Sequence, residues 1–125
     1  MKNQIFSRPW IQEVYELVKV IDLHLSIPPE KKFDSELFRI EILKSLLEID
    51  KYYISVWRAE NFRLQSTHPQ SKGVPQDEPS DELIWVEDYF FWTDSNEVYA
   101  PNLDTVLKKV INIFESRLKH CGAID

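Results

Sequence analysis

Residues 82–94 constrain the fold of this chain more than any other stretch. They contain two of the four tryptophans, three further aromatic residues and four acids, but no lysine or arginine. Ile84 and Val86 alternate with Trp85 and Glu87, and this period of two is typical of a half-buried strand. The stretch therefore predicts a strand over 83–92, followed by a turn through 93–96.

Two other segments have strand character. Residues 36–45 alternate apolar and charged side chains, which predicts a strand, although the leucines in and after this segment would instead support a helix. Residues 52–58 are rich in aromatic and β-branched residues, which favour strands. We expect residues 59–61 to turn the chain into a shorter strand through Phe62 and Leu64.

Two segments have helical periodicity. Residues 7–26 place apolar side chains three and four apart behind a capping Ser7 and an early proline, which predicts an amphipathic helix. A second helix is predicted to open at Asn102, to bury a stripe from Leu103 to Leu118, and to end near Gly122. The predicted fold is therefore one α+β domain over 1–125: an antiparallel sheet of three to four strands packed on an N-terminal and a C-terminal helix, with a long loop at 66–81.

Alternation also divides the predicted strands between two faces of the sheet. One face is mostly aliphatic and is the expected bed for the helices; it carries Phe38, Ile40, Ile42, Ile54, Val56, Ile84, Val86, Phe90 and Trp92. The opposite face mixes large aromatic rings with charges and carries Arg39, Glu41, Tyr53, Ser55, Trp57, Trp85, Glu87, Tyr89 and Phe91. Asp88 would point toward the aliphatic face, which suggests a bulge near Glu87 and Asp88.

The charge of the chain is unevenly distributed. The net charge is −6, and no basic residue occurs between Lys72 and Lys108, an interval that holds nine of the 21 acids. The remaining residues have 15 bases against 12 acids. Nucleic acid and anionic membranes would be repelled by the acidic interval, so we expect neither as a partner. A cationic partner is compatible with it.

We find no sequence pattern for catalysis, a cofactor or a metal. Glu87 and Asp88 would point to opposite faces of a strand and could not share a substrate. Residues 94–105 begin like a calcium loop but have Tyr99 where glycine is required and Thr105 where the final glutamate belongs. A single cysteine, Cys121, fits a reducing compartment. We therefore expect a non-enzymatic cytoplasmic domain without cofactor, signal peptide or membrane span.

The aromatic and acidic residues together predict a protein-binding surface, because tryptophan and tyrosine are enriched in binding hot spots and exposed aromatic patches mark partner sites. The predicted contact residues are Trp57, Asp81, Glu82, Trp85, Glu87, Tyr89, Asp94 and Glu97.

In size, in acidity and in its aromatic, acidic stretch Asp77–Asp94, the chain resembles bacterial toxin-immunity proteins. That resemblance implies a one-to-one complex with a basic toxin domain, often a nuclease, whose active site is blocked. Two alternatives stay open. The aromatic face could instead be buried in a homodimer, or a pocket beneath the 66–81 loop, lined by Trp57, Trp85 and Tyr89, could bind a small ligand.

Overall fold

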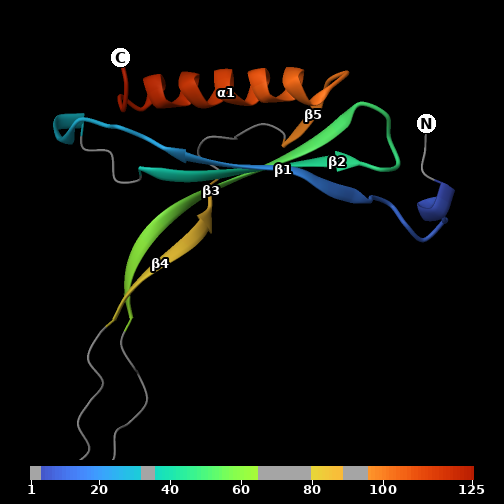
Figure 1. Cartoon of the computed structure of the whole chain (residues 1–125), viewed down its shortest axis with the longest axis horizontal. Helices are drawn as coiled ribbons and strands as arrows, with labels where there is room; N and C mark the ends of the chain where they lie inside the picture. The colour runs from blue at the N-terminus through green and yellow to red at the C-terminus, as the bar shows by residue number, and fades with distance from the viewer. Residues whose placement is uncertain (1–3, 32–35, 65–79, 89–95) are drawn as a thin grey trace, which may run out of the picture.

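The computed structural model describes residues 4–31, 36–64, 80–88 and 96–125. In this part of the chain one α-helix lies across one face of an antiparallel sheet (Figure 1). The elements are, in order, the short 3-10 helices and strands η1 (Gln4–Phe6), β1 (Tyr15–His24), η2 (Pro29–Lys31), β2 (Leu37–Ser45), β3 (Lys51–Leu64), β4 (Ser80–Glu87) and β5 (Glu97–Tyr99), and then the helix α1 (Leu103–His120). No helix in the described ranges is long and apolar enough to cross a membrane.

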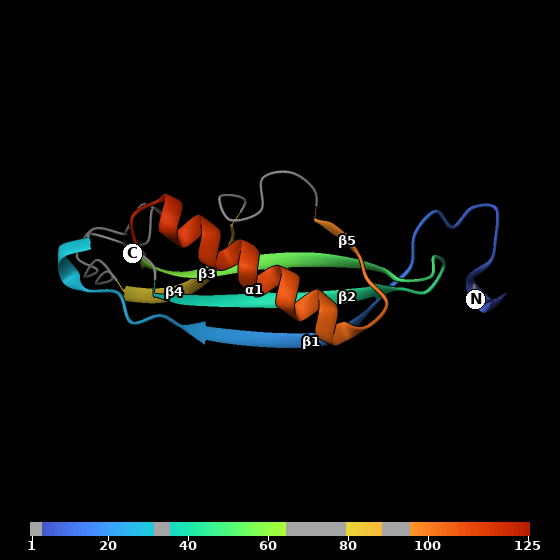
Figure 2. The same ribbon diagram turned by 90° about the horizontal axis from the view of Figure 1, so that it is seen from above.

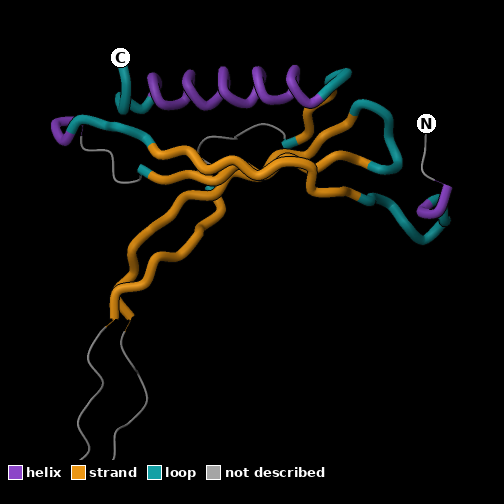
Figure 3. The backbone as a smooth tube through the Cα atoms, in the orientation of Figure 1, coloured by secondary structure: helices purple, strands orange, loops and turns teal. Residues whose placement is uncertain are grey.

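The sheet is a meander in the order β1-β2-β3-β4, and β5 pairs with the beginning of β3. β3 is the longest strand, with 14 residues, and its second half pairs with β4 from Trp57 to Leu64. Figures 1 and 3 show this β3–β4 ribbon bending away from α1. The ribbon therefore leaves the layer that the helix covers.

The core lies between α1 and the aliphatic face of the central strands. Phe38, Ile40, Ile42, Ile54 and Val56 are all buried there, as their alternation predicted. The helix buries Val106, Val110, Phe114 and Leu118, which recur every four residues and form one stripe. The rings of Phe114 and Phe38 meet edge to face, with 5.1 Å between their centroids. Figure 2 shows α1 crossing these strands obliquely.

The predicted C-terminal helix is confirmed, including its ends. Asn102 is the N-cap, and its side-chain Oδ1 accepts a hydrogen bond of 2.9 Å from the backbone N–H of Thr105. Gly122, just beyond the helix, has a φ of 81°, a left-handed conformation that side chains other than glycine adopt at a cost.

The predicted N-terminal helix is wrong, because residues 15–24 form the edge strand β1. A register shift between Leu17 and Lys19 inserts one extra residue into the pairing with β2. Val18 and Ile21 can therefore both pack on the core although they are three residues apart. A bulged strand can thus have the same spacing of apolar residues as a helix, and the pairing with β2 determines that this segment is a strand.

The other strand predictions stand with changes of length. Residues 37–45 form a strand, which resolves the ambiguity of that segment. Residues 59–61 do not turn, since they continue β3 by pairing with Trp85, Ile84 and Leu83. β4 begins at Ser80, so the predicted loop ends earlier than 81.

Two predictions about β4 also change. Ile84 and Val86 have the expected parity, but Ile84 is 38% exposed because the ribbon bends away from the helix. The pairing of β3 with β4 shows no shift, so the predicted bulge near Glu87 is absent from the described pairing.

Candidate protein-binding face

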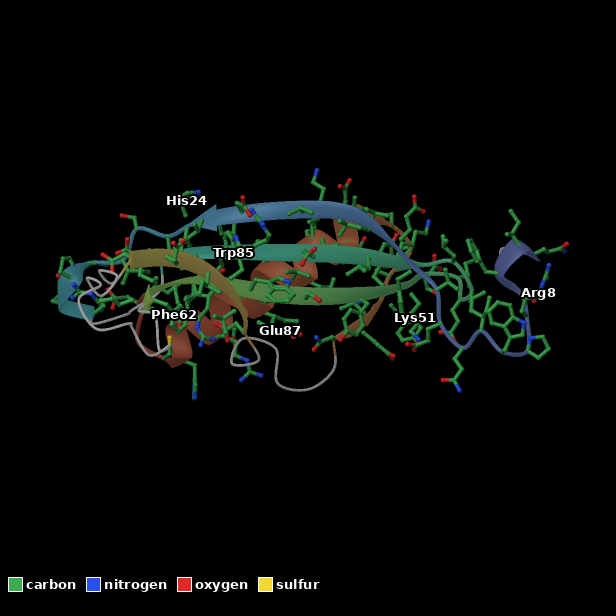
Figure 4. All side chains as sticks on the ribbon, turned by 90° about the horizontal axis from the view of Figure 1, so that it is seen from below. Arg8, His24, Lys51, Phe62, Trp85 and Glu87 are labelled. Carbon is green, nitrogen blue, oxygen red and sulfur yellow. The ribbon has the colours of Figure 1, made fainter. Side chains whose placement is uncertain are left out.

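The candidate site is the face of the sheet opposite α1, which we call the open face because no helix of the described residues covers it. Directly paired residues of neighbouring strands share a face, so the register assigns its members. It consists of cross-strand rows: Asp22, Arg39, Trp57 and Glu87; Val20, Glu41 and Ser55; Leu17, Leu43 and Tyr53; with Tyr15 and Trp85 beside them. Figure 4 views the molecule from this side, with Trp85, Glu87 and Lys51 labelled.

The centre of the open face is a stack of three side chains from three strands. Arg39 donates two hydrogen bonds to the carboxylate of Asp22, from Nε at 2.7 Å and from Nη2 at 3.2 Å. The guanidinium carbon of Arg39 lies 4.3 Å from the centre of the Trp85 ring. Asp22 therefore fixes the arginine fork, and the flat guanidinium holds the indole ring by a cation–π contact.

The ion pair within this stack shifts the pKa values of both of its members. The hydrogen bond from Arg39 holds the pKa of Asp22 below its ordinary value, and the same contact raises the pKa of Arg39. Both side chains keep about a third or more of their surface in solvent, with exposed fractions of 42% and 35%. The pair is therefore screened by water, and its main effect is on geometry.

Trp57 lies on the central strand β3, between β2 and β4. It pairs with Arg39 on one side and with Glu87 on the other. Its indole Nε1 is shielded from solvent and finds no hydrogen-bond acceptor among the described residues. Trp57 is therefore a packing residue of this face, whereas Trp85 contributes the ring that lies over Arg39.

A second cluster lies at the far end of the face, around Lys51. This lysine is only 7% exposed, and its ammonium lies 3.3 Å from Glu48, 3.3 Å from Glu97 and 3.6 Å from Glu13. The pKa of Lys51 is raised by the Tyr15 hydroxyl first and by Glu97 and Glu48 next, while desolvation opposes the rise. The Tyr15 hydroxyl itself is buried and makes no hydrogen bond of ordinary geometry within the described part.

The Lys51 cluster joins segments that are distant in sequence. Glu13 precedes β1, Glu48 belongs to the turn after β2, and Glu97 opens β5. Three carboxylates around one ammonium leave an excess of negative charge at this end of the sheet. Tyr99 adds a hydroxyl that donates to Glu48 at 3.4 Å.

The structure brings only part of the predicted contact set together. Trp57, Trp85 and Glu87 lie side by side on the open face, and Asp81 has the same parity further along β4, opposite Arg63. Glu82 pairs with Phe62 and points to the other face. The carboxylate of Glu97 forms an ion pair with Lys51. Tyr89 and Asp94 lie outside the described residues.

Asp88 has the inward orientation that its parity predicted. It is 3% exposed, and its Oδ2 lies 3.6 Å from Nη1 of Arg58. Arg58 also pairs with Glu60, and these contacts raise the pKa of Arg58, the hydrogen bond with Glu60 contributing most. The charge of this inward carboxylate is therefore balanced by an arginine of the neighbouring strand. The predicted bulge, which would have turned the carboxylate away from the core, is not present in the described pairing.

Sequence reasoning missed Asp22 and Tyr15, because it assigned their segment to a helix. The signal was present in the alternation of exposed Asp22 and His24 with half-buried Ile21 and Leu23. No group of three or more His, Cys, Asp and Glu side chains in the described part is arranged to hold a metal ion.

Comparison with known proteins identifies a family. No curated protein and no solved structure matches the chain. The family model described as "Uncharacterised protein YehK" matches residues 15–121. That span runs from the first residue of β1 to the residue after α1, and it includes every element of the sheet and the helix that covers it. The chain therefore belongs to the YehK family.

Proposed function

We propose that this chain is a non-catalytic protein-binding domain and that its open face binds a protein with a basic surface. The observation that carries the proposal is the stack of Asp22, Arg39 and Trp85, which presents an ordered aromatic ring on a sheet face that α1 leaves uncovered. A domain that keeps tryptophans, tyrosines and an arginine on one uncovered face has the residue types of a binding hot spot.

The distribution of charge supports a cationic partner. α1 carries four bases and two acids, so 11 of the 15 bases and 19 of the 21 acids lie elsewhere in the chain. The helix is thus locally basic, and the rest of the chain has a net charge of −8. Such an asymmetry orients an approaching cationic protein toward the sheet and accelerates association at low salt.

The specific form that we propose is an immunity protein, an inhibitor that covers the active site of a cognate basic toxin domain such as a nuclease. The support is the small acidic domain and the uncovered aromatic face. A face whose central side chains already contact one another, as Asp22, Arg39 and Trp85 do, suits one-to-one inhibition, because less ordering entropy is lost on binding. The single cysteine fits the cytoplasm as the compartment.

The experiment is a pull-down from a lysate of the source organism at low and high salt, followed by kinetics with the purified partner. Trp85→Ala removes the central ring, and Ile113→Ala removes a side chain that is 37% exposed on α1, away from the open face. We expect Trp85→Ala to accelerate dissociation about tenfold or more. Ile113→Ala should behave as the wild type.

Two results would contradict the proposal. Equal binding by the wild type and Trp85→Ala would remove the open face from the contact. A partner that binds but whose toxicity in a growth assay is unaffected by co-expression of this chain would refute the inhibitor function and leave only protein binding.

A second candidate is a homodimer through the same face. Leu17 and Val20, on β1, are 50% and 46% exposed and extend the aromatic centre into an apolar strip. Sedimentation at several protein concentrations distinguishes the two, since a dimer that dissociates on Val20→Asp would favour self-association. The small-ligand alternative depended on the 66–81 loop, most of which lies outside the described residues.

A further inference from the structure

The two long edges of the sheet differ in their protection against pairing with another strand. Edge strands are normally blunted by bulges, prolines or charged side chains, above all lysines. β1 has two of these devices, a bulge between Leu17 and Lys19 and the lysine itself. β4 has no bulge, proline or lysine from Ser80 to Glu87, and its only charged side chains are acids, which repel another acidic strand but not a basic one.

The direction of the backbone groups on β4 follows from one hydrogen bond. The N–H of Asp88 donates to the carbonyl of Val56 on β3 at 2.8 Å. In an antiparallel pair, residues alternate between pointing both backbone groups at the partner and pointing both away. The outward-facing N–H and C=O groups on which strand addition would act are therefore those of Asp81, Leu83 and Trp85. Among the described residues, β4 pairs with β3 alone.

The side chains along β4 select what can pair there. Asp81, Glu82 and Glu87 are its only charged residues, so two copies of β4 paired with each other would bring six acids and no base onto adjoining strands. Charge repulsion therefore disfavours self-pairing. Leu83 and Ile84 are 57% and 38% exposed and point to opposite faces of the ribbon, so either face offers apolar contact beside the acids.

We propose that the outer edge of β4 binds an extended basic segment of a protein partner by strand addition, so that the segment becomes the next strand of the sheet. Main-chain hydrogen bonds supply the attachment. In a segment in which bases and apolar residues alternate, the bases can lie on the face of Asp81 and Glu87, and the apolar residues on the face of Ile84 and Val86. This inference deepens the proposed function, on which it rests for the basic nature of the partner.

The test uses the full chain and a capped eight-residue peptide in which lysine and valine alternate. Binding is followed by titration of the protein's backbone amide signals in nuclear magnetic resonance spectra. We expect the largest shifts at the outward-facing residues of β4, small shifts on β1, and no binding of the corresponding glutamate–valine peptide. High salt should weaken the complex.

Two substitutions at one position separate the main chain from the side chain. Leu83→Pro removes an outward N–H without breaking a bond to β3, and proline is tolerated on the free side of an edge strand. Leu83→Ala keeps that N–H and loses only the side chain. We expect Leu83→Pro to weaken peptide binding about tenfold more than Leu83→Ala, the effect of one lost hydrogen bond together with the altered backbone.

Equal affinities of the two variants would overturn the proposal, as would peptide-induced shifts on β1 or the open face alone. If Leu83→Pro does not fold, judged by its helical circular dichroism, the double reversal Asp81→Lys and Glu82→Lys decides instead. Strand addition then predicts that the variant prefers the glutamate–valine peptide, and an unchanged preference would refute it.

The same variants separate this inference from the proposed function. Loss of the natural partner in Trp85→Ala together with wild-type binding by Leu83→Pro would reject the β4 edge and retain the open face. Loss in Leu83→Pro with retention in Trp85→Ala would support the β4 edge and reject the open face.

Discussion

Replacing Phe114 by alanine tests whether α1 is the cover of the core. Phe114 is 5% exposed in the middle of the helical stripe, and its ring meets Phe38, which is fully buried, edge to face at 5.1 Å. Truncation of a buried phenylalanine costs about 3–5 kcal/mol, from lost transfer energy and from the cavity that remains. A domain of this size has a free energy of unfolding of roughly 5–15 kcal/mol, so the variant loses a large share of it.

The matched control is Ile113→Ala, one position earlier on the same helix. Ile113 is 37% exposed, so its truncation creates no buried cavity. The change should cost less than about 1 kcal/mol, since only partial burial and a small difference in helix propensity are involved. Both residues become the same good helix former, so the comparison isolates burial.

The assay is urea unfolding followed by far-ultraviolet circular dichroism, with the slope compared between variants. An unchanged slope and a lower midpoint show a loss of stability alone. A cost below about 1 kcal/mol for Phe114→Ala, equal to that of Ile113→Ala, would refute the packing of α1 on the sheet, because a ring enclosed as described cannot be removed at that cost.

Two further predictions concern the charged clusters. Because Arg39 lowers the pKa of Asp22, the pair stabilises the fold above the ordinary aspartate pKa of about 3.9, and this stabilisation is lost as pH falls through the lowered value. In Asp22→Asn, the urea midpoint should therefore decrease less than that of the wild type as pH falls through this range. An equal decrease in both proteins would contradict the pairing. Lys51→Met leaves the carboxylates of Glu13, Glu48 and Glu97 without their shared cation, so the variant should be less stable than the wild type at pH 7; thermal melts of both proteins at pH 7 measure this, and an unchanged melting temperature would contradict a stabilising role for the cluster.

The bend of the β3–β4 ribbon links the site to the fold. The register is continuous along β3, yet α1 covers only the part of the sheet before the bend. The ring of Trp85 reaches Arg39 on β2, across the intervening strand. A flat sheet would keep these side chains further apart, so the geometry of the open face depends on strand curvature as well as on alternation.

Several features were determined by the sequence alone. The alternation of Phe38, Ile40 and Ile42 placed them on the core face, and the capping asparagine and final glycine bounded α1. These are local signals, because a side chain's face in a strand and the end of a helix depend on neighbouring residues only. Alternation likewise predicted that Trp57, Trp85 and Glu87 share a face.

The tertiary structure decided what depends on distant residues. Residues 15–24 became a strand because β2 offered hydrogen bonds and a bulge adjusted the register, although their apolar spacing suits a helix equally well. Asp22 met Arg39, and Lys51 collected three glutamates, only after the meander had closed. Periodicity reports how one segment divides its faces, and it carries no information about which segment will lie beside it.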